Sequence, residues 1–183
     1  MRYQSFSRGA SRVATGGLLA ALSLLLLYGA TLLPSGRIGM VAVAGLVPAA
    51  GVISGGLATG FLCYGATALL GLLLLPDKGC ALLYVLFFGL YPMVKYVIER
   101  LRKLPVELVL KLAFFNLILV IFLLGFSALL FPLLPELMRT PLPLFGMGNV
   151  VFLIYDYGFS KLIAYYASRI RKAKHNTDTT RKG

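Results

Sequence analysis

The fold is decided by a stretch without any charged residue, 38-IGMVAVAGLVPAAGVISGGLATGFLCYGATALLGLLLL-75, which is 38 residues long. A helix crosses about 30 Å of hydrocarbon with roughly 20 residues, so the stretch is too long for one crossing and long enough for two. Its middle contains the glycine-rich segment Gly51-Val-Ile-Ser-Gly-Gly56, and glycines permit a tight turn. We therefore predict two helices joined within this segment, the first containing Pro48 and the second ending at Pro76.

Four more apolar runs flank this pair, at about 13–33, 80–99, 106–131 and 144–168. The chain of 183 residues is 59% hydrophobic and 13% charged, with a mean hydropathy of +0.88. Soluble domains are only about 45–50% apolar. We predict an all-α polytopic membrane protein, a bundle of six transmembrane helices. Residues 1–12 would form a basic N-terminal arm, residues 13–168 the membrane domain, and residues 169–183 a basic tail.

The positions of the basic residues predict the orientation. The net charge is +12, but the 18 lysines and arginines sit mainly at the ends of apolar runs rather than on one polar surface. With the N-terminus inside, thirteen lie on the inner side and three on the outer side, namely Arg37, Lys78 and Arg139. This is the positive-inside pattern. It places both termini in the cytoplasm of a multi-pass protein, most simply in a bacterial plasma membrane, and argues against nucleic-acid binding.

Polar residues within the apolar runs are the candidate functional cluster. Such residues are costly in hydrocarbon and usually face the bundle interior or a water-filled cavity. At 1.5 Å per residue, Lys95 lies about 22 Å and Asp156 about 18 Å from the outer face, and Asn116 about 15 Å from the inner face. These three residues, with Tyr91 and Glu99, are predicted to share a level in the middle or inner part of the bilayer.

Within this cluster the preferred pairing is Lys95 with Asp156. Glu99, one turn after Lys95, would turn toward Arg102, Lys103 or Lys111. Pro92 removes a backbone donor and kinks a helix, which leaves carbonyls that need partners inside the bundle. The cluster would serve as a lock or coupling element. The alternatives are a buried ion pair that only fixes helix register, or lysines that snorkel to the interface.

The outer side of the bundle has an aromatic character. Tyr28, Tyr84 and Asn149 lie near the outer ends of the first, fourth and sixth runs, close to Phe145 and two glycines. They could line an apolar pocket with a few polar anchors, although an interfacial aromatic belt explains the tyrosines equally well. The only histidine lies in the tail, and no cysteine pair, nucleophile elbow or phosphate-binding loop is present. We therefore expect no catalysis, no metal and no cofactor.

A series of small residues carries a family resemblance. It consists of Ala10, Ala14, Gly17 and Ala21, at helical spacing in the first run. Together with the chain's size, the six runs and the Gly/Pro-broken second and third helices, it resembles the substrate-binding S-components of energy-coupling-factor (ECF) vitamin transporters. The small-residue spacing also suits close helix packing within one chain.

The resemblance implies a function and a set of contacts. The small-residue face would dock a transmembrane coupling subunit, which works with separate ATPases. Tyr84, Asn149 and the loop ending at Arg37 would lie near a small vitamin-like ligand captured from outside. The charged cluster departs from this pattern, because its depth places it away from the outer pocket.

The chain also resembles the rod-shape membrane protein MreD, which would make it a non-catalytic scaffold of a cell-envelope assembly complex. A scaffold needs no ligand pocket. An open outer pocket therefore favours the transport function, and a filled one the scaffold.

Overall fold

The computed structural model describes residues 3–180, with side chains for residues 9–137, 139–166 and 168. Its elements in chain order are α1 (Tyr3–Leu32), α2 (Arg37–Gly55), α3 (Leu57–Leu74), α4 (Lys78–Leu83), the π-helical turn η1 (Tyr84–Phe88), α5 (Tyr91–Glu99), α6 (Leu104–Gly125), α7 (Ser127–Leu130), the 3-10 turns η2 (Phe131–Leu133) and η3 (Glu136–Met138), and α8 (Pro141–Thr180). Six spans within the described residues are long and apolar enough to cross a membrane, with α4, η1 and α5 forming one of them. The all-α, six-span prediction is confirmed.

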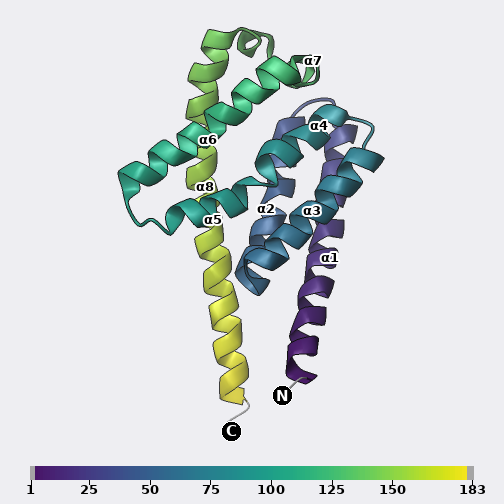
Figure 1. The fold of residues 1–183 in the computed structure, drawn as a ribbon, viewed down its shortest axis with the longest axis vertical. Helices are drawn as coiled ribbons and strands as arrows, with labels where there is room; N and C mark the ends of the chain where they lie inside the picture. The colour runs from purple at the N-terminus through teal and green to yellow at the C-terminus, as the bar shows by residue number, and fades with distance from the viewer. Residues whose placement is uncertain (1–2, 181–183) are drawn as a thin grey trace.

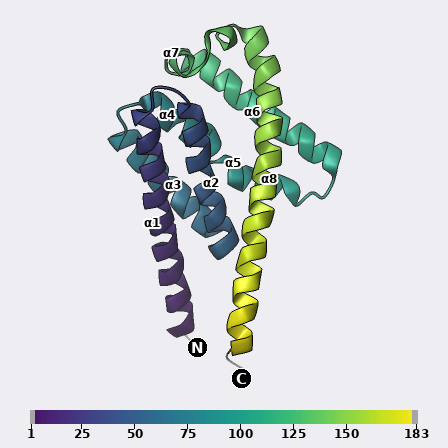
Figure 2. The same ribbon diagram turned by 180° about the vertical axis from the view of Figure 1, so that it is seen from behind.

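The helices form two groups (Figure 1). Helices α1, α2 and α3 pack side by side, and the long helix α8 runs along the other side of the molecule. Helix α6 rises obliquely across α8, and α5 leads into it from the centre of the fold. The beginning of α1 and the end of α8 lie at the same end of the molecule, as the view from behind also shows (Figure 2). This agrees with an even number of crossings.

Two glycines set the geometry of α2. Gly56 has φ +84°, a conformation that L side chains rarely adopt, and it alone separates α2 from α3. The predicted turn within residues 51–56 is therefore present. Gly45, in the middle of α2, lies so close to η1 that an added Cβ would be 2.5 Å from the backbone oxygen of Phe88. This close approach brings α2 against the fourth span.

The fourth span is broken where the sequence contains Pro92. A proline lacks the N–H that would bond to the carbonyl four residues earlier, and its ring clashes with that carbonyl. The helix accommodates this with η1, in which the N–H of Gly89 donates to the carbonyl of Tyr84, five residues back, at 2.8 Å. The carbonyl of Val85 accepts a hydrogen bond from the Tyr64 hydroxyl at 2.8 Å. The predicted kink is thus a π-helical break stabilised by α3.

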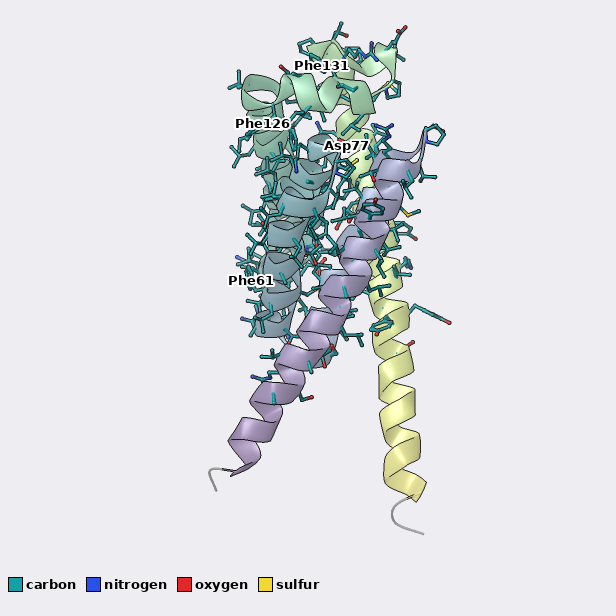
Figure 3. The ribbon with its side chains drawn as sticks, turned by 90° about the vertical axis from the view of Figure 1, so that its right-hand side faces the viewer. Phe61, Asp77, Phe126 and Phe131 are labelled. Atoms are coloured by element: carbon teal, nitrogen blue, oxygen red, sulfur yellow. The ribbon has the colours of Figure 1, made fainter. Side chains whose placement is uncertain are left out.

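The fifth predicted helix is wrong at its end. Helix α6 stops at Gly125 rather than near Phe131, because Phe126 leaves the helical region (φ −137°, ψ 27°). The short elements α7, η2 and η3 then cap the end of the bundle opposite the termini, where Figure 3 shows Phe126 and Phe131 above Asp77. Helix α8 begins earlier than predicted, at Pro141 rather than Leu144. Proline suits the first position of a helix, because the N–H at that position would have no acceptor within the helix.

The predicted N-terminal arm (residues 1–12) and tail (residues 169–183) lie partly outside the described residues. The described backbone shows that α1 already begins at Tyr3 and that α8 continues to Thr180. Residues 3–12 and 169–180 therefore extend the first and last membrane helices, and the side chains of the basic residues in both segments, apart from Arg12, lie outside the described part.

Candidate functional site: an ion network below an apolar cavity

Asp156 on α8 is the centre of an ion network. It accepts hydrogen bonds from Lys95 Nζ and from the Tyr91 hydroxyl on α5, and from Lys111 Nζ on α6 at 3.1 Å. Lys95 Nζ also donates to Ser160 Oγ at 2.8 Å, one turn after Asp156. One carboxylate thus connects α5, α6 and α8.

Glu99 completes the network on its more exposed side. Its Oε1 lies 2.7 Å from Lys95 Nζ and 2.8 Å from Lys111 Nζ. Lys95 is only 1% exposed and Lys111 6%, whereas the Glu99 side chain is 41% exposed. Two cations and two carboxylates balance, which is the condition under which charges are tolerated in an apolar interior. We call Tyr91, Lys95, Glu99, Lys111, Asp156 and Ser160 the ion network.

Local sequence explains how each helix presents these groups. Residues four apart lie on one face of a helix. Lys95 and Glu99 have this spacing on α5, and so do Asp156 and Ser160 on α8. The Lys95 ammonium also lies 5.8 Å from the centroid of the Phe159 ring, a favourable position for a cation.

The structure changes the predicted membership of this cluster. The Lys95–Asp156 ion pair is present as predicted, and Glu99 does bind Lys111, but it binds Lys95 as well. Lys111, predicted only as a possible partner of Glu99, also binds Asp156, and Ser160 belongs to the network although no prediction named it. The spacing of Asp156 and Ser160 was the sequence signal for the serine.

Asn116 was predicted in the cluster and pairs elsewhere. Its amide donates to Asn149 Oδ1 at 2.9 Å, and the Asn149 amide donates back to Asn116 Oδ1 at 3.1 Å. Each amide also donates to a backbone carbonyl of its own helix, that of Leu112 or Phe145. This reciprocal pair joins α6 to α8, and among the described residues none of its hydrogen bonds goes to the ion network.

An apolar cavity of about 500 Å³ lies between α2 and the α6–α8 pair, toward the end of the bundle opposite the termini. Aromatic and aliphatic side chains from α2, α4, η1, α6, α7, the η2–η3 loop and α8 line it. The lining residues are Ile38, Gly39, Ala42, Leu83, Phe87, Phe88, Phe115, Ile118, Leu119, Phe122, Leu130, Leu134, Pro135, Leu144, Gly148, Val151, Phe152, Ile154 and Tyr155. Ligand pockets commonly enclose about 300–1,000 Å³ and are mostly apolar.

A floor of aromatic rings separates the cavity from the ion network. Phe87 lines the cavity, and its ring centroid lies 5.6 Å from that of Tyr91 in the network. Phe115 of α6 stacks on Phe152 of α8 with centroids 4.7 Å apart and planes 7° apart. Cavity and network therefore share the same three structural elements, η1–α5, α6 and α8.

None of the four predicted ligand residues lines the cavity. Tyr28 is exposed on α1, and Arg37 forms an ion pair with Asp77 at 3.2 Å. Tyr84 is fully buried and hydrogen-bonded to Ser23 at 3.2 Å. Asn149 is engaged with Asn116, although its neighbour Gly148 does line the cavity. Their contact with a ligand stays a prediction.

Within the part of the chain that the structure describes, nothing covers the predicted docking face of α1. Ala10, Ala14, Gly17 and Ala21 are all exposed, and a Cβ on Gly17 would meet no atom within 4 Å. The opposite face of α1, with Gly16, packs on α3 instead. Whether a partner covers the exposed face stays a prediction.

In the described residues, no group of three or more histidine, cysteine or acidic side chains could hold a metal ion. No family model, curated protein or solved structure matches the chain.

Proposed function

We propose that this multi-pass membrane protein is the substrate-binding component of a small-molecule uptake system that relies on a separate ATPase module. The observation that carries the proposal is the apolar cavity of about 500 Å³ between α2, η1, α6 and α8. An outer bundle filled by side chains would have left no space for a ligand. The sequence has no Gly-x-x-x-x-Gly-Lys-Ser/Thr loop, so a separate subunit would bind ATP.

The proposal includes an orientation in the membrane. We infer from the positive-inside pattern that both termini lie in the cytoplasm, and propose a bacterial plasma membrane as the location. The cavity then lies in the outer half of the bilayer, where a ligand would be captured. The exposed small-residue face of α1 would contact the coupling subunit through close helix packing.

Ligand retention tests the binding function. The protein is purified from membranes in mild detergent, and small molecules released by solvent are identified by mass spectrometry. Gly39→Leu tests whether they came from the cavity, because Gly39 lines it and an added Cβ meets no atom within 4 Å. Gly65→Leu is the matched control, since Gly65 on α3 is equally open but lies away from the cavity. A molecule retained by the wild type and Gly65→Leu but lost from Gly39→Leu supports the proposal; no retained molecule in any of them contradicts it.

A scaffold of a cell-envelope assembly complex is the second candidate. The ion network favours it, because a balanced set of buried charges fixes how α5, α6 and α8 meet without any ligand. Copurification separates the two functions. A coupling subunit with an ATPase pair supports transport, whereas cell-wall synthesis proteins whose association Gly39→Leu leaves unchanged support the scaffold.

A further inference from the structure

We propose that the cavity takes a neutral lipophilic molecule with one hydrogen-bonding group, which enters sideways from the bilayer and bonds to the Tyr155 hydroxyl. This inference rests on the proposed ligand-binding function and names its ligand class and route of access. Three observations lead to it: the chemistry of the lining, the unpartnered hydroxyl of Tyr155, and the exposure of the α8 residues at the cavity edge.

The lining excludes charge. Among the described residues that line the cavity, Tyr155 alone has a polar side-chain group. A carboxylate, phosphate or ammonium placed there would lose its hydration and find no partner of opposite charge, which costs many kcal/mol in an apolar site. The charges of the ion network cannot serve, because they are paired with one another below the aromatic floor. The part of a ligand inside the cavity is therefore neutral.

Tyr155 supplies the single polar contact. Its hydroxyl oxygen is buried in the cavity wall and has no hydrogen-bond partner among the described residues. Buried polar groups in proteins almost always have one, and leaving a hydroxyl unpaired is unfavourable. The Tyr155 ring packs against Phe88, with centroids 5.4 Å apart, and against Phe159, with centroids 5.7 Å apart. A turn of the Tyr155 side chain toward the cavity that it lines would bring the hydroxyl to a hydroxyl, carbonyl or ether oxygen on the ligand.

Access from the bilayer follows from the edge of the cavity. Val151 and Ile154 of α8 line the cavity, and yet they are 55% and 67% exposed on the surface of the chain. Both lie within the candidate span Pro141–Tyr166, where the surroundings are lipid rather than water. Gly39 of α2, opposite them in the lining, is exposed as well. The cavity therefore opens between α2 and α8 toward the acyl chains, where lipophilic molecules concentrate.

Tryptophan fluorescence tests the access route, because the chain contains no tryptophan. Phe122 lines the cavity and Phe159 does not, and both are 2% exposed, so Phe122→Trp and Phe159→Trp are matched in burial. Leu124→Trp, two residues along α6 and 84% exposed, reports direct contact with lipid. Each full-length variant is placed in phosphatidylcholine vesicles and titrated with dibrominated lauryl alcohol, whose bromines quench tryptophan on contact.

We expect saturable quenching of Phe122→Trp by at least about twofold, quenching of Leu124→Trp that rises without saturation, and little quenching of Phe159→Trp.

A substitution of Tyr155 tests the polar contact. Tyr155→Phe removes only the hydroxyl, and one hydrogen bond corresponds to a change of about threefold to tenfold in affinity. In the Phe122→Trp background, Tyr155→Phe should raise the half-quenching concentration of the alcohol by that factor and leave that of dibromododecane unchanged.

Tyr64→Phe is the matched control for this substitution, because Tyr64 is partly buried, does not line the cavity and donates to the Val85 carbonyl. It should leave both titrations unchanged. If Phe122→Trp is quenched no more than Phe159→Trp, the access route from the bilayer is wrong. If alcohol and alkane bind equally and Tyr155→Phe affects neither, the polar contact is wrong. Either result leaves the ligand-retention experiment above to decide the proposed function separately.

Discussion

The ion network predicts that charge balance matters more to stability than the number of ion pairs. Lys95→Met removes one of two cations and keeps a side chain of similar length. Lys95 is 1% exposed, so water cannot replace the lost ammonium around Asp156. Breaking a buried ion pair by removing one partner typically costs about 3–5 kcal/mol. Asp156 keeps Tyr91 and Lys111, the latter at 3.1 Å, so the lower end of this range, about 3 kcal/mol, is expected.

Two double variants separate balance from pair count. Lys95→Met with Asp156→Leu leaves Lys111 and Glu99 paired at 2.8 Å and the network neutral. Lys95→Met with Lys111→Met leaves two carboxylates and no cation. Replacing a whole buried pair by apolar groups is often nearly neutral. The balanced double variant should therefore be at least as stable as Lys95→Met alone, and more stable than the unbalanced one by about 2 kcal/mol or more.

The free energy of unfolding is measured by titrating the purified protein from mild detergent into dodecyl sulfate and following helix content. Lys161→Met is the matched control: Lys161 is exposed on α8, 5.4 Å from the Tyr157 ring, and its loss should change stability by no more than about 0.5 kcal/mol. Equal stability of the two double variants would refute the reasoning. So would simple additivity of Lys95→Met and Asp156→Leu, because it would mean that the two residues do not interact.

Three further predictions concern the amide pair, the close contact at Gly45 and the exposed face of α1. Asn116→Leu should cost about 1 kcal/mol in the same unfolding assay, and Asn116→Leu with Asn149→Leu less than the sum of the single variants, because the amides satisfy each other. Gly45→Ala should destabilise by about 1–3 kcal/mol, since its Cβ would meet the Phe88 backbone; an unchanged unfolding midpoint would contradict the close approach of α2 and η1. Gly17→Val should leave the isolated chain as stable as wild type but reduce copurification of a membrane partner, and an undiminished yield would argue against docking on this face of α1.

The number of crossings could be predicted because it depends on the lengths of apolar runs. The turn at Gly56 was marked by glycines, and the break in the fourth span by Pro92. The end of α6 could not be predicted, because the sequence from Gly125 to Phe131 has no charged residue and no proline. Its hydropathy does not distinguish a continuing membrane helix from the short turns that follow.

The candidate site was predictable only in part, because counting residues gives the level of a side chain only for helices that run straight across the membrane. Lys95 and Asp156 meet, as their depths suggested. Asn116 does not join them, because α6 runs obliquely (Figure 1) and Asn116 meets Asn149, which lies about 10 Å before Asp156 along α8. The cavity could not be predicted from the sequence for a similar reason. It lies where α2, η1, α6 and α8 meet without filling the space between them, and no run of residues encodes such a meeting of helices locally.

The neighbouring positions of cavity and network suggest how opening would be controlled. Tyr155 lines the cavity, and the next residue, Asp156, is the centre of the network. Moving α8 away from η1 to widen the cavity would also pull Asp156 away from Lys95, because α5 continues the span that contains η1. Lys95 is buried and would keep only Glu99 as an ionic partner, so losing its pair with Asp156 would cost several kcal/mol. A ligand that fits the cavity as it stands avoids this cost, whereas a larger one must break the network to enter.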